Sequence, residues 1–134
     1  MNRDNCVIFM SVSDVIKLHD MAIERFGGAS GLRDSGLLES AIHQPLMMID
    51  FGEAADREVY QLGAAYFYHI IKNHPFIDGN KRAGLLAAIE FFHRNGFGII
   101  IESDILYQIA LDTAASRLTK QGLAMLFRQG IKLL

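Results

Sequence analysis

Residues 74–82 gather side chains that together could act on a phosphate-containing substrate. The segment contains a histidine, a carboxylate, an amide, a lysine and an arginine: His74, Asp78, Asn80, Lys81 and Arg82. A neutral histidine can accept a proton from a hydroxyl group near physiological pH. One carboxylate together with substrate phosphates is a common way to hold Mg²⁺, and lysine and arginine bind phosphate oxygens. These parts suit the transfer of a phosphorus group to a hydroxyl, with His74 as the base and Asp78 as the metal ligand.

This segment lies at the junction of two predicted helices. A proline disfavours helical geometry in the residue before it, so we expect the preceding helix to end near Asn73. Gly79 opens an apolar-periodic segment and can adopt a positive φ or approach a ligand closely. The amide groups at a helix start form an anion site. Lys81 and Arg82 oppose the helix dipole there, each at a cost of about 0.3 to 1 kcal/mol, which favours a negatively charged ligand.

Each of these side chains also has a simpler interpretation. Asp78 would serve only as the N-cap of the following helix, and His74 would be a hydrogen-bonded loop residue. Lys81 and Arg82 would be solvated charges. These interpretations leave two cations facing the helix dipole, and a histidine beside a carboxylate of the metal-binding type, without a purpose. The combined pattern therefore favours an anion-handling site.

The rest of the chain is predicted to be a helical scaffold for this segment. Periodicity and capping residues predict helices near 11–26, 35–44, 53–73, 80–94, 103–116 and 119–131. Pro45 is expected to end the second helix, and residues 46–52 would form a short helical turn or a loop. Two β-leaning runs, 6–10 and 98–101, could pair in a minimal ribbon. The helix over 80–94 is apolar on most sides, so an all-α fold around this central helix is expected.

Composition and charge narrow the class of protein. The 134 residues suffice for one domain with a hydrophobic core, and 51% apolar with 21% charged residues is typical of a globular protein. The net charge of −2 argues against a non-specific nucleic-acid binder, so no direct contact with nucleic acid is expected. A single cysteine, Cys6, excludes an internal disulfide and is expected to be a small buried hydrophobe.

Neither a leader nor a membrane span is expected. Residues 1–5 carry charges of both signs and no long apolar run follows them, unlike a secretory signal. The densest apolar stretch, 83–92, contains Glu90 and is too short to cross a bilayer. We therefore expect a cytoplasmic protein that makes no contact with a membrane.

The sequence His-Pro-Phe-Ile-Asp-Gly-Asn-Lys-Arg at 74–82 resembles the Fic/Doc family signature. That signature has His, any residue, Phe, any residue, Asp or Asn, Gly or Ala, Asn, Gly or Lys, and Arg. Further segments, Leu-His-Asp at 18–20, Phe-Gly-Gly at 26–28, 31–41 and 92–96, resemble the Doc (death-on-curing) branch. The resemblance covers nearly the whole chain. It implies one Fic/Doc domain over residues 1–134, a compact bundle of about six helices around a central motif helix.

The resemblance also implies a role for each residue of the motif. His74 would take the proton of a target hydroxyl, and Asp78 would hold Mg²⁺. Phe76 would anchor the loop in the core. The phosphates of ATP would be held by main-chain amides and side chains at the helix start, from Gly79, Asn80, Lys81 and Arg82.

Two positions bear on the reaction type. AMP-transferring Fic proteins have glycine where this chain has Lys81 and a second arginine where it has Leu85. Leu85 is three residues after Arg82, so the two side chains are neighbours on a helix and no second guanidinium can grip the distal phosphates of ATP. Both changes resemble the Doc branch. They imply a kinase-like toxin that transfers the γ-phosphate to a threonine of elongation factor Tu and arrests translation.

Other functions remain open at this point. The chain could be an AMP-transferase or an AMP-removing enzyme, if Lys81 is tolerated, or a catalytically silent nucleotide-binding module. An RNA-cleaving toxin is disfavoured by the acidic charge balance.

The Doc resemblance also implies restraint by a separate Phd-like antitoxin, a disordered segment that folds into a groove of the toxin. The internal inhibitory helix of some Fic proteins, Ser/Thr-x-x-x-Glu-Gly/Asn, is matched by Ser35 and Glu39 but not by Ser40. Three apolar residues are candidates either for the antitoxin surface or for the core: Met47, Met48 and Phe51.

Three side chains outside the motif carry minor expectations. Glu90, among apolar residues, is expected either to reach solvent or to find a partner, and Arg94 lies four residues later in the orientation that favours a helix pair. His69 is expected to be a hydrogen-bonded helix residue rather than a metal ligand, and His19 has no signal of its own.

Overall fold

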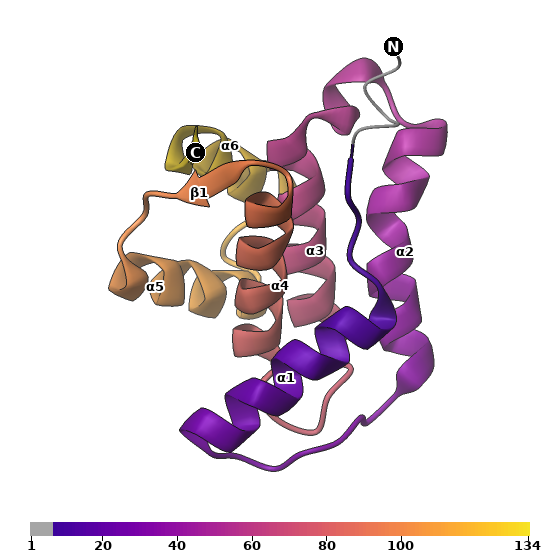
Figure 1. Cartoon of the computed structure of the whole chain (residues 1–134), viewed down its shortest axis with the longest axis vertical. Helices are drawn as coiled ribbons and strands as arrows, with labels where there is room; N and C mark the ends of the chain where they lie inside the picture. The colour runs from indigo at the N-terminus through magenta and orange to yellow at the C-terminus, as the bar shows by residue number, and fades with distance from the viewer. Residues whose placement is uncertain (1–6) are drawn as a thin grey trace.

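The structure, a computed structural model, describes residues 7–134. The prediction of an all-α fold is confirmed, because the described residues form six α-helices and two very short strands (Figure 1). The helices are α1 (Val12–Phe26), α2 (Ser35–Phe51), α3 (Val59–Asn73), α4 (Asn80–Arg94), α5 (Ser103–Ala114) and α6 (Lys120–Gly130). A 3₁₀-helix, η2 (Ala54–Arg57), precedes α3, and the strands are β1 (Phe97–Ile99) and β2 (Ile131–Leu133).

The centre of the bundle is the pair α3 and α4, which lie side by side with α2 on one side and α5 and α6 on the other, while α1 runs obliquely across the lower part of the view (Figure 1). Small residues allow this close packing. A Cβ atom on Gly63 of α3 would lie 2.1 Å from the ring of Phe92, and one on Gly84 of α4 would lie 2.8 Å from Ile71. The motif helix is therefore buried in the middle of the fold, as its apolar pattern predicts.

Three of the helices begin at a residue whose side chain caps the helix. Ser11 caps α1 and forms a reciprocal capping box with Asp14, Asp34 caps α2, and Thr119 caps α6. In each case the side-chain oxygen accepts a hydrogen bond from a main-chain N–H group of the first turn.

The prediction that Pro45 ends the second helix is wrong. Helix α2 continues through Pro45 to Phe51. Leu38, Ala41 and Pro45 recur at helical spacing on a buried face against α3, and this packing outweighs the hydrogen bond that proline cannot make. The helix expected over 53–73 is instead divided into η2 and α3.

The expectation that the β-leaning run at 98–101 pairs with the run at 6–10 is also wrong. Strand β1 pairs antiparallel with β2, with Phe97 opposite Leu133 and Ile99 opposite Ile131. The last helix therefore ends at Gly130 rather than including Ile131. Of the run at 6–10, residues 7–10 form no strand, and Cys6 lies outside the described residues.

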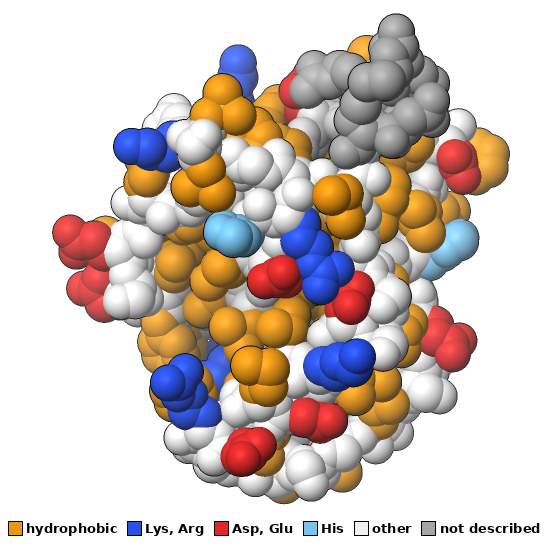
Figure 2. Space-filling model, viewed as in Figure 1, with side chains coloured by type: hydrophobic (Ala, Val, Ile, Leu, Met, Phe, Trp, Pro, Cys, Tyr) orange, Lys and Arg blue, Asp and Glu red, His pale blue; other side chains and the backbone are white. Residues whose placement is uncertain are grey.

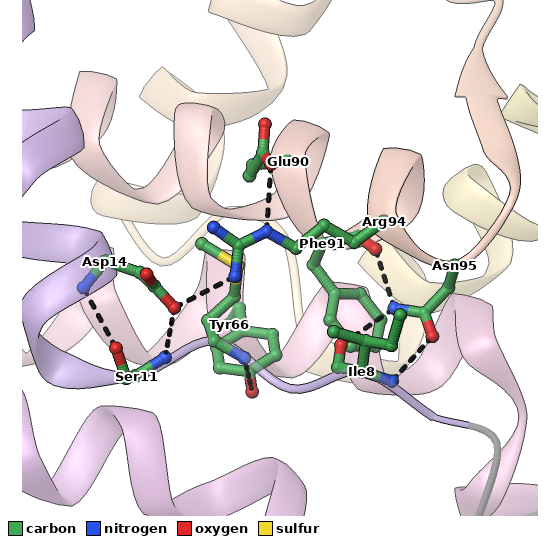
Figure 3. Close-up of polar contacts among 9 residues, drawn as sticks. Ile8, Ser11, Asp14, Tyr66, Glu90, Phe91, Arg94 and Asn95 are labelled. Atoms are coloured by element: carbon green, nitrogen blue, oxygen red, sulfur yellow. Dashed lines mark hydrogen bonds and ion pairs between the residues drawn. The ribbon is translucent and has the colours of Figure 1, made fainter.

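Tyr66 of α3 and Asn95, the C-cap of α4, hold the segment before α1 (Figure 3). The amide of Asn95 accepts a hydrogen bond from Ile8 N at 2.8 Å and donates one to Ile8 O at 2.9 Å. The hydroxyl of Tyr66 accepts a hydrogen bond from Met10 N at 2.9 Å. These polar groups are thus paired with side chains rather than with a strand.

An ion-pair network joins α1 to the end of α4 (Figure 3). Of the two outcomes left open for Glu90, the structure shows the pair, with Arg94 Nε 2.9 Å from Glu90 Oε2. Arg94 Nη1 also lies 2.9 Å from Asp14 Oδ2. Mainly through this hydrogen bond from Arg94, and also through the one from Ser11 N, the pKa of Asp14 falls from its ordinary 3.8 to about 2.

Hydrophobic side chains gather over α4 on the face drawn in Figure 2, between α1 and α5, with acidic and basic side chains interspersed around them. No helix within residues 7–134 combines the length and the apolar character that a bilayer span requires.

Candidate active site

The motif begins at the end of α3. The helix ends at Asn73, as predicted, and His74 is its C-cap with φ 52° and ψ 54°. This left-handed conformation is unfavourable for a residue other than glycine. It turns the chain sharply out of the helix, and the His74 side chain is exposed at the turn.

The loop before α2 holds this strained turn. Arg33 Nε donates to His74 O at 2.9 Å, and Arg33 Nη2 donates to Asn73 O at 3.2 Å. The main-chain N–H groups of Arg33 and Asp34 both donate to Pro75 O, at 2.7 and 3.0 Å. A cation at the end of α3 also complements the helix dipole. Sequence reasoning missed Arg33, because its partners lie some 40 residues away along the chain.

Asn80 closes the motif loop from the other side. It is only 5% exposed. Its Oδ1 accepts from Phe76 N at 2.8 Å and its Nδ2 donates to Phe76 O at 3.0 Å. The side-chain amide, expected to contact phosphate, is therefore engaged with the buried Phe76. The main-chain N–H of Asn80 belongs to the first turn of α4, where helix geometry supplies no intrahelical acceptor.

Asp78 is not the N-cap of α4; Gly79 is, with φ 76°. Asp78 Oδ2 accepts from Ala29 N at 3.1 Å, and Asp78 Oδ1 accepts from Gly79 N at 2.9 Å. These two hydrogen bonds, the one from Ala29 foremost, lower the pKa of Asp78 and keep the exposed carboxyl ionised. The capping interpretation of Asp78 is thus excluded.

One pocket of about 320 Å³ brings the predicted site residues together. Its polar part is lined by His74, Asp78, Gly79, Asn80, Lys81 and Arg82. Its apolar part is lined by Ile71, Ile77 and Leu85 and, from α5, by Tyr107, Ala110 and Ala114. An exposed imidazole, an ionised carboxylate and a helix start with two cations therefore line the same space.

Comparison with known proteins assigns the family. A model of the Fic/DOC family matches residues 9–92. The chain belongs to the Fic/DOC family. It is 29% identical to Protein kinase doc of Escherichia phage P1 over 120 residues, which is 90% of this chain and 93% of that protein. It is 32% identical to Toxin Doc of Mycolicibacterium smegmatis over 97 residues, 72% of each chain, and these relatives place it in the Doc branch.

The donor set of this Fic/DOC chain fits a loosely held Mg²⁺. Among the described residues, no three His, Cys, Asp or Glu side chains form a metal-binding group. Asp78 is the one carboxylate among the residues that line the pocket. One ionised carboxylate suits an ion that brings its phosphate ligands with the substrate, and does not suit an all-protein metal centre.

The two cations of this Fic/DOC motif differ in their surroundings. Arg82 is exposed, and its guanidinium carbon lies 4.4 Å from the ring centre of Phe26, the last residue of α1. Lys81 is half-buried on the pocket wall. Leu85 lies one turn after Arg82 on that wall, where the sequence pattern places it.

Two histidines outside the motif have ring nitrogens buried in the structure. His19 is buried, and its Nε2 lies 2.7 Å from Asp78 O. The expectation of a hydrogen-bonded His69 fails at Nε2, which is buried and has no hydrogen-bond partner among the described residues. Burial, with a smaller contribution from Lys120, lowers the pKa of His69 to about 4. His69 is not among the residues that line the pocket.

Proposed function

We propose that this chain is a Doc-type toxin that uses ATP and Mg²⁺ to phosphorylate a hydroxyl group of a protein. The observation that carries the proposal is the single pocket shared by an exposed histidine, an ionised aspartate and a helix start bearing two cations. Family membership and a relative named a protein kinase support a protein-modifying enzyme at the coarser level. As target we propose a threonine of elongation factor Tu, whose modification would arrest translation.

Each residue of the pocket has a distinct part in this reaction. His74 accepts the proton of the target hydroxyl while the hydroxyl oxygen forms a bond to the γ-phosphorus. The bond between that phosphorus and the bridging oxygen breaks, and ADP leaves with the electron pair. Asp78 would hold Mg²⁺, which neutralises charge on the phosphates.

The phosphate oxygens would be bound at the start of α4. The main-chain N–H groups of its first turn have no acceptor within the helix, and Asn80, Lys81 and Arg82 of this turn line the pocket. Lys81 and Arg82 add positive charge there. The two buried hydrogen bonds between Phe76 and Asn80 hold this helix start in place. The N–H donors of α4 therefore need not reorganise when a phosphate binds.

The pocket wall supports transfer of the terminal phosphate rather than of AMP. Apart from His74, the basic residues that line it are Lys81 and Arg82, and the next turn of α4 contributes Leu85. A leucine cannot bind the distal phosphates of a nucleotide that enters with its α-phosphate at the helix start. The proposal is therefore that the γ-phosphate occupies this anion site.

The test uses purified protein, Mg²⁺ and ATP labelled at either the γ- or the α-phosphate, with elongation factor Tu as acceptor. Label from the γ-position alone is expected. The variant His74→Ala should lose transfer, whereas His43→Ala, an exposed histidine of α2 outside the pocket, should retain it. Label from the α-position would assign AMP transfer. Nucleotide binding without product on any of a panel of translation factors would identify a silent binding module.

We further propose a Phd-like antitoxin as the partner that restrains this activity. A relative is named a toxin, and Glu39, the candidate for an internal inhibitory glutamate, is not among the residues lining the pocket. On α2, Met47 and Phe51 are exposed, Phe51 at 82%, whereas Met48 packs against the core. Met47→Ser and Phe51→Ser should weaken antitoxin binding if α2 contributes to the antitoxin surface, with toxin folding unchanged.

A further inference from the structure

We propose that His19 is a positioning residue, which fixes the peptide group between Asp78 and Gly79 so that the carboxylate and the helix start face the pocket. The consequence for catalysis rests on the proposed function, in which Asp78 holds Mg²⁺. The geometric statement about His19 does not depend on it.

The first observation is a short hydrogen bond from a fully enclosed ring. His19 is 1% exposed, and its Nε2 lies 2.7 Å from the main-chain oxygen of Asp78. A carbonyl oxygen can only accept, so Nε2 must carry the proton. The other ring nitrogen, Nδ1, has no hydrogen-bond partner within residues 7–134, and Asp20 Oδ1 lies 3.9 Å from it. Within the described residues, the one hydrogen bond of this ring is therefore the bond to Asp78 O.

The second observation is a flat contact with the motif loop. The ring of His19 stacks on that of Phe76 with centroids 3.8 Å apart and planes inclined by 8°. Phe76 is itself buried, and its main chain is clamped by Asn80. The ring is thus held in one orientation, with Nε2 directed at Asp78, before any ligand enters the pocket.

The third observation is the direction of the peptide group that His19 contacts. In a trans peptide the C=O and N–H bonds point in opposite directions. With Asp78 O directed at α1, Gly79 N–H points away from α1 and donates to Asp78 Oδ1 at 2.9 Å. Gly79 has φ 76° and, being glycine, can adopt other backbone conformations at little cost. The hydrogen bond from His19 therefore opposes a rotation of this peptide, which would break the bond from Gly79 N–H to Asp78 Oδ1 and move the carboxylate away from the pocket.

A purely structural role in the core would not require this direction. His69 offers the comparison, because it also has a buried ring nitrogen without a partner, but it lies outside the pocket. His19 differs from His69 in donating to the one peptide group that joins the proposed metal ligand to the N-cap of α4.

The experiment separates the ring of His19 from its N–H group. His19→Phe keeps an aromatic ring against Phe76 and removes the donor, whereas His19→Gln keeps a donor of similar reach and removes the ring. His69→Phe and His69→Gln are the matched controls. For each variant, the melting temperature, the kcat for phosphate transfer and the Mg²⁺ concentration for half-maximal rate are measured.

We expect His19→Phe to raise the Mg²⁺ requirement, lower kcat or both by about 10- to 100-fold, as for other groups that orient a metal ligand. His19→Gln should recover most of this loss, and the His69 variants should leave both constants unchanged. Two results would overturn the proposal: wild-type constants in His19→Phe, or losses in both His19 variants that only follow their loss of folded protein.

A second measurement needs no activity and keeps the inference distinct from the proposed function. Proton–nitrogen spectra of the wild-type imidazole should show His19 with its proton on Nε2. In His19→Gln, which retains the donor, the amide signals of Ala29 and Gly79 should stay close to their wild-type positions, and in His19→Phe they should move. A proton on Nδ1 of wild-type His19 would overturn the inference even if phosphate transfer is observed. Absence of transfer with the expected spectra would refute only the proposed function.

Discussion

The guanidinium of Arg33 donates a hydrogen bond to the main-chain oxygen of His74 across 41 residues of sequence, at 2.9 Å. This bond, and the second one from Arg33 to Asn73, hold the end of α3 where the chain turns into a left-handed conformation. The proposed base is therefore placed by a loop that precedes α2. The position of His74 depends on this contact as much as on its own helix.

Replacing Arg33 tests that dependence. Arg33→Ala removes two hydrogen bonds from a charged donor, and we expect the free energy of unfolding to fall by about 1 to 2 kcal/mol. Arg33→Lys should lose part of this, because an ammonium group does not bridge two carbonyls as a guanidinium does. Urea denaturation measures the effect, with Arg25→Ala, an exposed arginine of α1, as the control. Equal stability of the Arg33→Ala and Arg25→Ala variants would contradict the prediction.

The left-handed conformation of His74 predicts an unusual order of stability among its variants. Glycine adopts φ near 52° without the clash that any Cβ atom meets there, so His74→Gly should be more stable than His74→Ala by about 1 kcal/mol. Both variants should lack phosphate transfer, since both lack the imidazole. Denaturation curves of the His74→Gly and His74→Ala variants measure the difference in their free energies of unfolding. Alanine as the more stable of the two would show that residue 74 does not have this conformation in solution.

Two adjacent glycines provide a matched test of the loop against Asp78. Gly27 and Gly28 both have positive φ, so an alanine at either should cost about 1 kcal/mol of stability through backbone strain. Only at Gly28 would the new Cβ meet Asp78, 2.7 Å from Oδ2, whereas nothing lies within 4 Å at Gly27. Gly28→Ala should therefore raise the Mg²⁺ concentration for half-maximal rate about tenfold more than Gly27→Ala does. Equal Mg²⁺ requirements in the two variants would show that the loop at Gly28 and Ala29 does not position the carboxylate of Asp78.

The ion pair between Asp14 and Arg94 predicts a pH dependence of stability. The pKa of Asp14 is about 2 in the folded chain and 3.8 ordinarily, so its contribution is complete above pH 3.8 and is lost as the pH falls through 2. The Asp14 side chain is 27% exposed, so after discounting for solvent screening we expect about 1 kcal/mol. The stability difference between wild type and Asp14→Asn, measured by denaturation from pH 7 to pH 2, should shrink over that interval. A constant difference would contradict the assignment.

Local features of this chain were readable without the structure. The end of α3 at Asn73 and the start of α4 beside Gly79 were predicted correctly, and α1, α2 and α6 begin within one residue of their predicted starts. They depend on interactions within one helical turn, and proline, glycine and capping residues act over that distance. The grouping of the motif side chains in one pocket follows for the same reason, since the motif spans only nine residues.

The failures have a common origin in packing between distant segments. The continuation of α2 through Pro45 depends on a buried face against α3, and the pairing of β1 with β2 depends on where α6 ends. The sequence of α2 does not reveal its packing against α3, and the sequence of β1 does not reveal its pairing with β2. The unpartnered Nε2 of His69 is similarly a result of what surrounds α3 rather than of the α3 sequence.

By itself, the sequence determined the chemical content of the site: a histidine, a carboxylate, two cations and a helix start within residues 74–82. Only the tertiary structure decided how these groups are aimed. His19, Ala29 and Arg33 contact the motif from 59, 49 and 41 residues away, and each bonds to a main-chain or carboxylate oxygen of the loop. Such bonds form only after the helices have packed, because the hydrophobic burial that brings α1 and the loop beside α4 is non-directional and specifies no individual pair in advance.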